Sequence, residues 1–153
     1  MYGNTGQAVQ VSSSNKVVLS DDARGATTFQ LLGCRASSIV PAAQRPSCVS
    51  LADADLTDWY LRDGGFYLKV DPEYETEDLP LFTVDSSFIL HKDTFYQGTY
   101  ALQSVNFPDH YIKSDVDGNL TIAQQDDSAD YNDTASFRIY DYDSAGMYSR
   151  FVC

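Results

Sequence analysis

The segment DWYLRDGGFYLKV, residues 58–70, decides the fold because a second copy of it follows later in the chain. Residues 109–122 read DHYIKSDVDGNLTI, so the Tyr-Leu-Arg that begins at Tyr60 returns as the Tyr-Ile-Lys that begins at Tyr111. Further on, residues 86–90 (SSFIL) return as residues 135–139 (ASFRI). Similarity of this kind along a chain indicates an architecture built from repeated structural units.

Each copy has the pattern of strand, turn, strand, turn, strand, acidic loop and strand. The strand segments alternate apolar and polar residues and are rich in Tyr, Phe, Val and Ile, which favour strands. The acidic loops are the equivalent stretches Asp71–Asp78 and Asp126–Asp133. The stretch 71–79 starts with Asp-Pro and has no apolar stripe, so we predict a loop there rather than a helix.

The N-terminus carries most of a third unit. Residues 8–11 (AVQV), 16–19 (KVVL) and 27–31 (TTFQL) supply three strands, but the opening strand is missing. The C-terminal residues 146–152 (GMYSRFV) resemble residues 98–105 (GTYALQSV), which open the preceding unit. We therefore expect the last strand to lie beside the N-terminal strands and complete their unit, which also removes an exposed sheet edge.

Three degenerate units of four short strands predict an all-β fold, the β-trefoil. The units are approximately residues 146–153 plus 3–33, residues 48–92 and residues 97–142, and together they form one domain over 1–153. A propeller needs at least four blades, and this chain has three units. An immunoglobulin-like sandwich would not account for the internal similarity.

The charge of the chain excludes several partners. Its formal net charge is −12, whereas binding to nucleic acid requires Lys and Arg side chains that neutralise phosphates. Anionic membrane surfaces are disfavoured for the same reason. No segment approaches the roughly 20 apolar residues of a membrane-spanning helix, so membrane insertion is not expected. Neutral ligands, basic proteins and cations remain open.

Three cysteines suggest one disulfide and one additional thiol. Cys34 and Cys48 flank a loop that contains Pro, Ala and Ser. A bridge between them would close a loop of about 15 residues and contribute about 3 kcal/mol in the chain-entropy model. Cys153 is then free or paired outside this chain, and the alternative is three reduced thiols in a cytosolic protein.

Two sequons favour an extracellular location. Asn119 and Asn132 each begin an Asn-X-Thr acceptor sequence for N-glycosylation. Residues 1–15 are polar and lack the apolar region of a signal peptide. We therefore expect a domain that belongs to a longer secreted or cell-surface protein.

The motifs resemble a known family. Residues 100–113 (YALQSVNFPDHYIK), followed by 119–122 (NLTI) and 134–139 (TASFRI), are similar to the repeat of the arabinofuranosidase B-type carbohydrate-binding module. Residues 58–63 (DWYLRD) with 84–88 (VDSSF) look like a second copy. The resemblance implies a β-trefoil that binds arabinofuranose side chains of plant polysaccharides, with one pocket in each repeat.

In that family a His that follows Tyr-Leu-Arg and an Asp that opens Asp-Ala-Thr-Phe contact the sugar. The second unit of this chain has Asp63 in place of the His and keeps Asp85. The third unit has Ser114 and Thr134 at these positions. In the N-terminal unit they fall on Ser12 and Ala26. No unit retains both groups, and only the second unit retains the carboxylate.

A furanose pocket needs a carboxylate that accepts hydrogen bonds from sugar hydroxyls, a second polar group and an apolar wall. We predict one such pocket, formed by Asp85, Asp63, Trp59 and Tyr60. Two facing carboxylates, Asp63 and Asp85, would bind a sugar differently from the family pair or would favour a cation. For Trp59, a core position in which its N–H finds a partner is the structural alternative.

Nothing in the sequence indicates catalysis, and no cofactor is expected. It has no nucleophile elbow, metal motif or phosphate loop, and nothing selects a carboxylate pair suited to a glycosidase. Its two histidines, His91 and His110, have no zinc-ligand spacing; His110 is expected to face outward, with sugar contact as the alternative. Residues 115–119 (DVDGN) predict a hairpin turn, with a partial calcium loop as the alternative.

These observations favour a non-catalytic extracellular recognition domain that binds a glycan. The rival hypothesis is a protein-interaction domain whose sugar sites are lost and whose acidic loops dock a basic partner. A spacer domain without a ligand is a third possibility.

Overall fold

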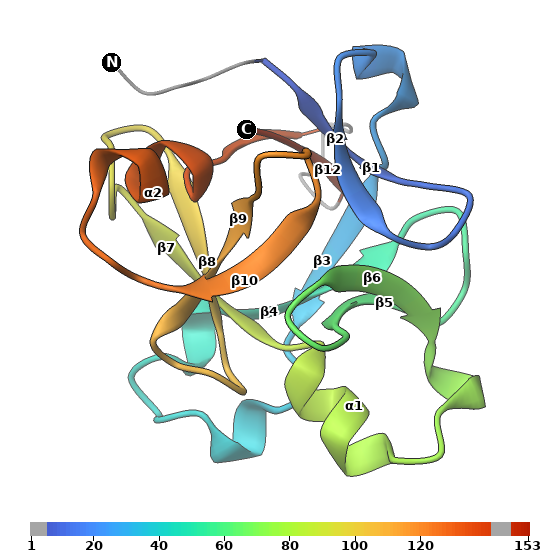
Figure 1. Cartoon of the computed structure of the whole chain (residues 1–153). Coiled ribbons are helices and arrows are strands. Elements are labelled where there is room, and N and C mark those ends of the chain that lie inside the picture. Colours follow the sequence, from blue (N-terminus) through green and yellow to red (C-terminus); the bar gives the residue numbers. More distant parts are fainter. Residues whose placement is uncertain (1–5, 142–147) are drawn as a thin grey trace.

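The computed structural model describes residues 6–141 and 148–153, which form an all-β protein (Figure 1). Within these residues, twelve short strands join in one antiparallel sheet in which most strands pair with a sequence neighbour. The strands are β1 (Ala8–Val11), β2 (Val17–Ser20), β3 (Phe29–Gly33), β4 (Cys48–Asp53), β5 (Trp59–Asp63), β6 (Leu68–Pro72), β7 (Phe88–Lys92), β8 (Tyr100–Ser104), β9 (His110–Ser114), β10 (Leu120–Gln124), β11 (Arg138–Asp141) and β12 (Tyr148–Val152).

Alternation along the strands builds the core. In β6 and β10 the apolar residues are buried while the residues between them are half-buried, as expected when successive side chains point to opposite faces. Three phenylalanines, Phe29, Phe88 and Phe137, lie at equivalent positions of the three units and are almost completely buried. They pack into one cluster with the apolar residues of the surrounding strands.

Three hairpins, β1–β2, β5–β6 and β9–β10, contact one another on one side of this core. Isolated bridges join them pairwise: Lys16 with Lys69, Val18 with Asn119, and Tyr67 with Thr121. Each hairpin therefore touches both of the others. This arrangement places the three hairpin turns in similar surroundings.

The last strand lies beside the N-terminal strands, as predicted. β12 pairs with β1 at Val152 opposite Ala8, with β3 at Ser149 opposite Phe29, and with β11 along its length. Gly146 and Met147, which the sequence assigned to this strand, lie outside the described residues.

The pairing of β12 fixes which of its residues correspond to those of β8. Gln103 pairs with Ile89, and Val152 pairs with Arg138, where Ile89 and Arg138 each follow a core phenylalanine. Phe151 therefore takes the place of the buried Leu102. The register thus places an apolar residue of each strand in the core.

A helix directly follows the first acidic stretch and another lies in the second, and the sequence interpretation missed both. The stretch 71–79 was predicted to be a loop, but β6 continues to Pro72, and a helix begins at Leu79. Asp78 caps this helix by accepting a hydrogen bond from the Leu81 N–H, a typical N-cap interaction. The second stretch contains a helix capped by Ser128. The helices are α1 (Leu79–Asp85) and α2 (Ala129–Thr134), with 3₁₀ turns at Ala23–Gly25, Ser37–Ile39, Arg45–Ser47 and Glu73–Glu75.

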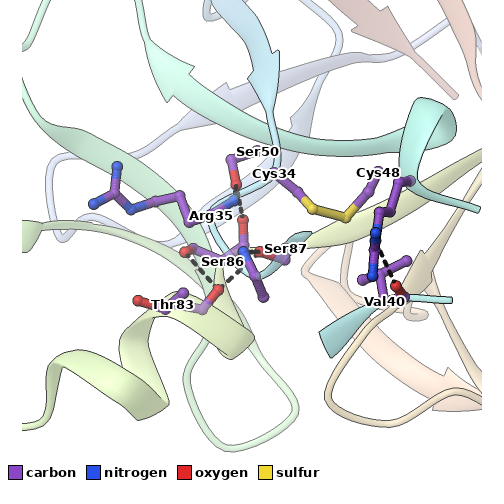
Figure 2. Close-up of a disulfide and its surroundings, with 10 residues drawn as sticks. Cys34, Arg35, Val40, Cys48, Ser50, Thr83, Ser86 and Ser87 are labelled. Atoms are coloured by element: carbon purple, nitrogen blue, oxygen red, sulfur yellow. Dashed lines mark hydrogen bonds between the residues drawn. A yellow bond between two sulfur atoms is a disulfide. The ribbon is translucent and has the colours of Figure 1, made fainter. Parts of the chain in front are cut away.

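A disulfide joins Cys34 to Cys48, as predicted, and Cys153 has a free, buried thiol. Figure 2 shows the loop that the disulfide closes and the serines that hold it. The Arg35 N–H donates to Ser50 Oγ, which in turn donates to the Ser86 carbonyl. Because Ser86 directly follows α1, the disulfide loop supports the end of that helix.

Candidate functional site

The last residue of α1, Asp85, is the centre of a polar cluster in the second unit. Its side chain is buried, with a residue exposure of 6%. Oδ2 accepts a hydrogen bond from Arg62 Nη2 at 2.9 Å, and Oδ1 accepts one from Asn106 Nδ2 at 2.8 Å. Burial raises the pKa of Asp85 and the nearby charge of Asp63 adds to this, while Arg62 and Asn106 oppose it. The cluster thus presents a carboxylate, an amide and a guanidinium together.

Arg62 connects this cluster to a polar hollow. Its guanidinium carbon lies 4.9 Å from the centroid of the Phe82 ring, and Nη1 lies 3.8 Å from Asp71 Oδ2. Arg62 Nε is buried and has no hydrogen-bond partner among the described residues. The hollow beside it has a volume of about 190 Å³ and is lined by Arg62, Asp71, Pro72, Glu75 and Thr76.

Asp63 lies close to Asp85 but has a structural partner. It is buried, and its Oδ1 accepts a hydrogen bond from the Phe66 N–H at 2.7 Å. This interaction holds the turn between β5 and β6. The charge of Asp63 contributes to the raised pKa of Asp85, and Asp63 is itself engaged in shaping the hairpin.

Trp59 and Tyr60 have packing partners of their own. Trp59 is half-buried and packs against the main core cluster. Tyr60 is buried edge-to-face against Phe82, and its hydroxyl accepts a hydrogen bond from Arg35 Nη1 at 3.2 Å. Tyr60 thus shares the Phe82 ring with Arg62. A direct role of Trp59 or Tyr60 in ligand binding stays a prediction.

The corresponding positions of the third unit enclose a thiol. Cys153 Sγ lies 4.0 Å from Ser114 Oγ and 3.8 Å from the Thr134 carbonyl oxygen. Burial is the largest cause of the raised pKa of Cys153. The last residue of the chain therefore fills the space between the two positions at which the family resemblance places sugar contacts.

The N-terminal unit has apolar residues at these positions. The sequence alignment placed Ser12 opposite Asp63, but Val11 pairs with Val17 in the way that Asp63 pairs with Leu68. The pairing register therefore puts Val11 at this position, together with Ala26.

The remaining sequence candidates have local roles. Asp115 Oδ1 accepts hydrogen bonds from two backbone N–H groups of its own turn, those of Asp117 and Asn119, which agrees with the predicted hairpin turn. Asn119 lies in that turn, and Asn132 lies in α2 with a buried Oδ1 that has no partner among the described residues. Whether either asparagine carries a glycan stays a prediction. His91 contacts Gln103 Oε1 through its Nε2 at 2.8 Å.

Sequence reasoning missed Arg62 and Asn106 as members of the site. Both lie within quoted motifs, Tyr-Leu-Arg and Ser-Val-Asn, but Arg62 reaches Asp85 from β5 and Asn106 reaches it from the turn between β8 and β9. Arg62 is 23 residues and Asn106 is 21 residues from Asp85 in the chain. The signal was the presence of a cation and an amide in otherwise apolar motifs.

Among the described residues, no cluster of three His, Cys, Asp or Glu side chains is suited to a metal ion. None of the helices in that part of the chain could cross a lipid bilayer.

The family model of the α-L-arabinofuranosidase B (ABFB) domain matches residues 4–139. The chain belongs to this family. ABFB domains are carbohydrate-binding modules, so the expected resemblance is confirmed. No curated protein matches the chain in sequence.

Solved structures that contain an ABFB domain share the fold. A mutant GH54 α-L-arabinofuranosidase soaked with 4-nitrophenyl α-L-arabinofuranoside matches with a TM-score of 0.67 at 19% identity, covering 89% of this chain and 28% of that one. An arabinofuranosidase complexed with arabinofuranosyl-α-1,2-xylobiose matches with a TM-score of 0.66 at 21% identity, with the same coverage. The chain therefore spans less than a third of the length of these enzymes.

Proposed function

We propose that this ABFB domain is a non-catalytic glycan-binding module whose binding site is the cluster around Asp85. The observation that supports this most directly is the buried Asp85 carboxylate, which is held by Arg62 and Asn106. Arg62 also lines a polar hollow of about 190 Å³. Sugar hydroxyls both donate and accept hydrogen bonds, so a carboxylate, an amide and a guanidinium form a suitable set of partners. Asp63 belongs to this proposed site through its proximity to Asp85.

We further propose that the fold is a β-trefoil over the single domain 1–153. Three hairpins that each touch the other two, and three buried phenylalanines at equivalent positions, support a threefold arrangement. In this proposal β12 completes the N-terminal unit, because it pairs with β1 and β3.

Arabinofuranose-bearing glycans are the ligand class that we propose. Family membership supports this choice, and one of the similar enzymes is complexed with arabinofuranosyl-α-1,2-xylobiose. The replacement of the family histidine by Asp63 changes the hydrogen-bonding set from a possible donor to an acceptor. We therefore expect a preference among arabinosides that differs from that of relatives with the histidine.

An extracellular, larger parent protein is part of the proposal. The disulfide between Cys34 and Cys48 is typical of oxidising compartments, and the two sequons agree with it. The domain corresponds to 28% of the length of the similar arabinofuranosidases.

The test is isothermal titration calorimetry with methyl α-L-arabinofuranoside and arabinofuranosyl-xylobiose. Asp85→Asn should abolish binding of both, because it removes the charge while preserving the shape of the side chain. The matched control is Asp53→Asn, which alters another buried carboxylate with a pKa raised by burial, at the end of β4. If Asp85→Asn binds both sugars as the unchanged protein does, the proposed site is wrong.

The alternative function is protein binding through the acidic stretches. Several of their carboxylates already have internal partners: Asp71 pairs with Lys69, Glu73 pairs with Arg35, and Asp78 caps α1. These interactions reduce the charge that is available to a basic partner. Salt-sensitive binding of a basic protein, combined with no binding to either sugar, would favour this alternative.

A further inference from the structure

One hairpin turn contains a residue that its backbone conformation disfavours. Two residues before the returning strand, the three equivalent hairpins have Asn15, Phe66 and Gly118, with φ values of 64°, 70° and 81°. Asn and Gly tolerate this left-handed region, whereas a bulky aromatic residue rarely adopts it. The second unit therefore keeps a strained residue at a position where its two counterparts avoid the strain.

Burial does not account for Phe66, because 46% of the residue is exposed. Its backbone is fixed on both sides: its N–H donates to Asp63 Oδ1, and its carbonyl accepts from the Ile122 N–H at 2.9 Å. A glycine would make both of these bonds without strain. Strain that folding does not require points to a function of the side chain.

The Phe66 ring belongs to a surface aromatic cluster. It lies 5.1 Å from the Phe107 ring and is stacked on the His110 ring at 5.6 Å, with an interplanar angle of 27°. Phe107 and His110 are in turn 5.5 Å apart. Two neighbours thus hold the exposed ring in a defined orientation.

This cluster is continuous with the Asp85 site. Phe107 directly follows Asn106, which donates to Asp85, and Phe66 is bonded through its backbone to Asp63. An aromatic surface therefore adjoins the polar cluster at the turn of the same hairpin that carries Arg62.

We propose that Phe66, supported by Phe107 and His110, is a stacking surface for the sugar ring next to the one held at Asp85. The C–H face of a sugar packs on an aromatic ring while its hydroxyls stay accessible to water or polar groups. The ligand is then an oligosaccharide of at least two rings. This inference rests on the proposed function, because it extends the same site.

The experiment compares a single sugar with a longer one on four proteins by calorimetry. The unchanged protein should bind arabinofuranosyl-xylobiose about tenfold more tightly than methyl α-L-arabinofuranoside, as expected for one added aromatic contact. Phe66→Gly should lose this advantage and still bind the monosaccharide. Phe66→Trp should keep it. The control Tyr140→Ser, which removes an exposed aromatic residue from β11, should change neither affinity.

Thermal unfolding separates a binding role from a structural one. Phe66→Gly should unfold at the same temperature as the unchanged protein or higher, because the strain is relieved. A markedly lower midpoint, or an unchanged advantage for the trisaccharide in Phe66→Gly, would overturn the inference. If Asp85→Asn still abolishes binding in that case, the proposed function stands without it. Absence of binding to both sugars by the unchanged protein would overturn both.

Discussion

Asp85 and Thr134 stand at corresponding positions, each three residues before a buried phenylalanine, yet their surroundings differ in kind. Asp85 is held by Arg62 and Asn106, and Arg62 also lines a polar hollow. Thr134 lies against the Cys153 thiol, which fills the corresponding space. The same backbone arrangement therefore supports a charged cluster in one unit and a closed, nearly neutral contact in another.

Near both Asp85 and Thr134, a basic side chain lies over an aromatic ring of the adjacent helix. Arg62 lies over Phe82 at 4.9 Å, and Lys113 lies over Tyr131 at 5.8 Å. The aromatic ring and the cation are thus present in both units. What differs is the residue three positions before the phenylalanine and the side chain that contacts it, Asn106 in one unit and Cys153 in the other.

The largest expected effect comes from removing the C-terminal strand, which pairs with the N-terminal strands and places Cys153 against the third unit. Deleting residues 148–153 removes β12 with its pairing to β1, β3 and β11, and it exposes the core around Phe151. Domains are stable by only about 5–15 kcal/mol, so the loss of a whole strand and of its buried phenylalanine is expected to unfold the chain. We expect the truncated chain to lack cooperative thermal unfolding, as measured by circular dichroism.

Cys153→Ala is the control for this deletion, because it empties the third position without removing the strand. It should fold normally with a modest loss of stability. A truncated chain that unfolds at the same temperature as the full chain would show that β12 does not close the structure.

A smaller effect is expected from exchanging the cation in each unit. Arg62→Met leaves the Asp85 carboxylate buried without its ion-pair partner, which should cost about 3 kcal/mol of unfolding free energy. The equivalent Lys113→Met leaves no buried carboxylate without a partner, so it should cost less than about 1 kcal/mol of unfolding free energy. Chemical denaturation at neutral pH measures both values.

The pH dependence of stability tests whether the cost of Arg62→Met comes from the Asp85 charge. Burial already raises the pKa of Asp85, and loss of Arg62 raises it further. The native state then binds the Asp85 proton more tightly than the unfolded state, so the stability of Arg62→Met should increase as the pH falls toward about 4. The double variant Arg62→Met/Asp85→Asn should recover most of the loss. Equal losses for Arg62→Met and Lys113→Met would contradict the distinction between the two units.

The sequence predicted the features that depend on local pattern. The strands, the acidic segments and the place of β12 follow from alternation and internal similarity, and the disulfide follows from two cysteines that flank one loop. The contacts of Asp85 could not be predicted, because Arg62 and Asn106 lie more than 20 residues from it in the chain, one in β5 and the other in the turn between β8 and β9. The strand register was also predicted incorrectly. In the N-terminal unit, Val11 rather than Ser12 takes the position equivalent to Asp63. A shift of one residue exchanges the side chains that face the core with those that face outward, and the sequence motif alone did not exclude such a shift.

The smallest effect on stability is expected at Tyr131, the aromatic residue of α2 that corresponds to Phe82 of α1. The Tyr131 hydroxyl donates to the Ala123 carbonyl at 2.6 Å, so Tyr131→Phe should cost about 1 kcal/mol at neutral pH. Burial is the main cause that raises the pKa of Tyr131 to about 12, against about 10 in the unfolded chain. The contribution of the protonated phenol is therefore complete below about pH 10 and is lost as the pH rises toward 12. Denaturation at neutral pH and at about pH 11 should show a smaller alkaline loss in Tyr131→Phe, and identical losses would contradict the burial of this phenol.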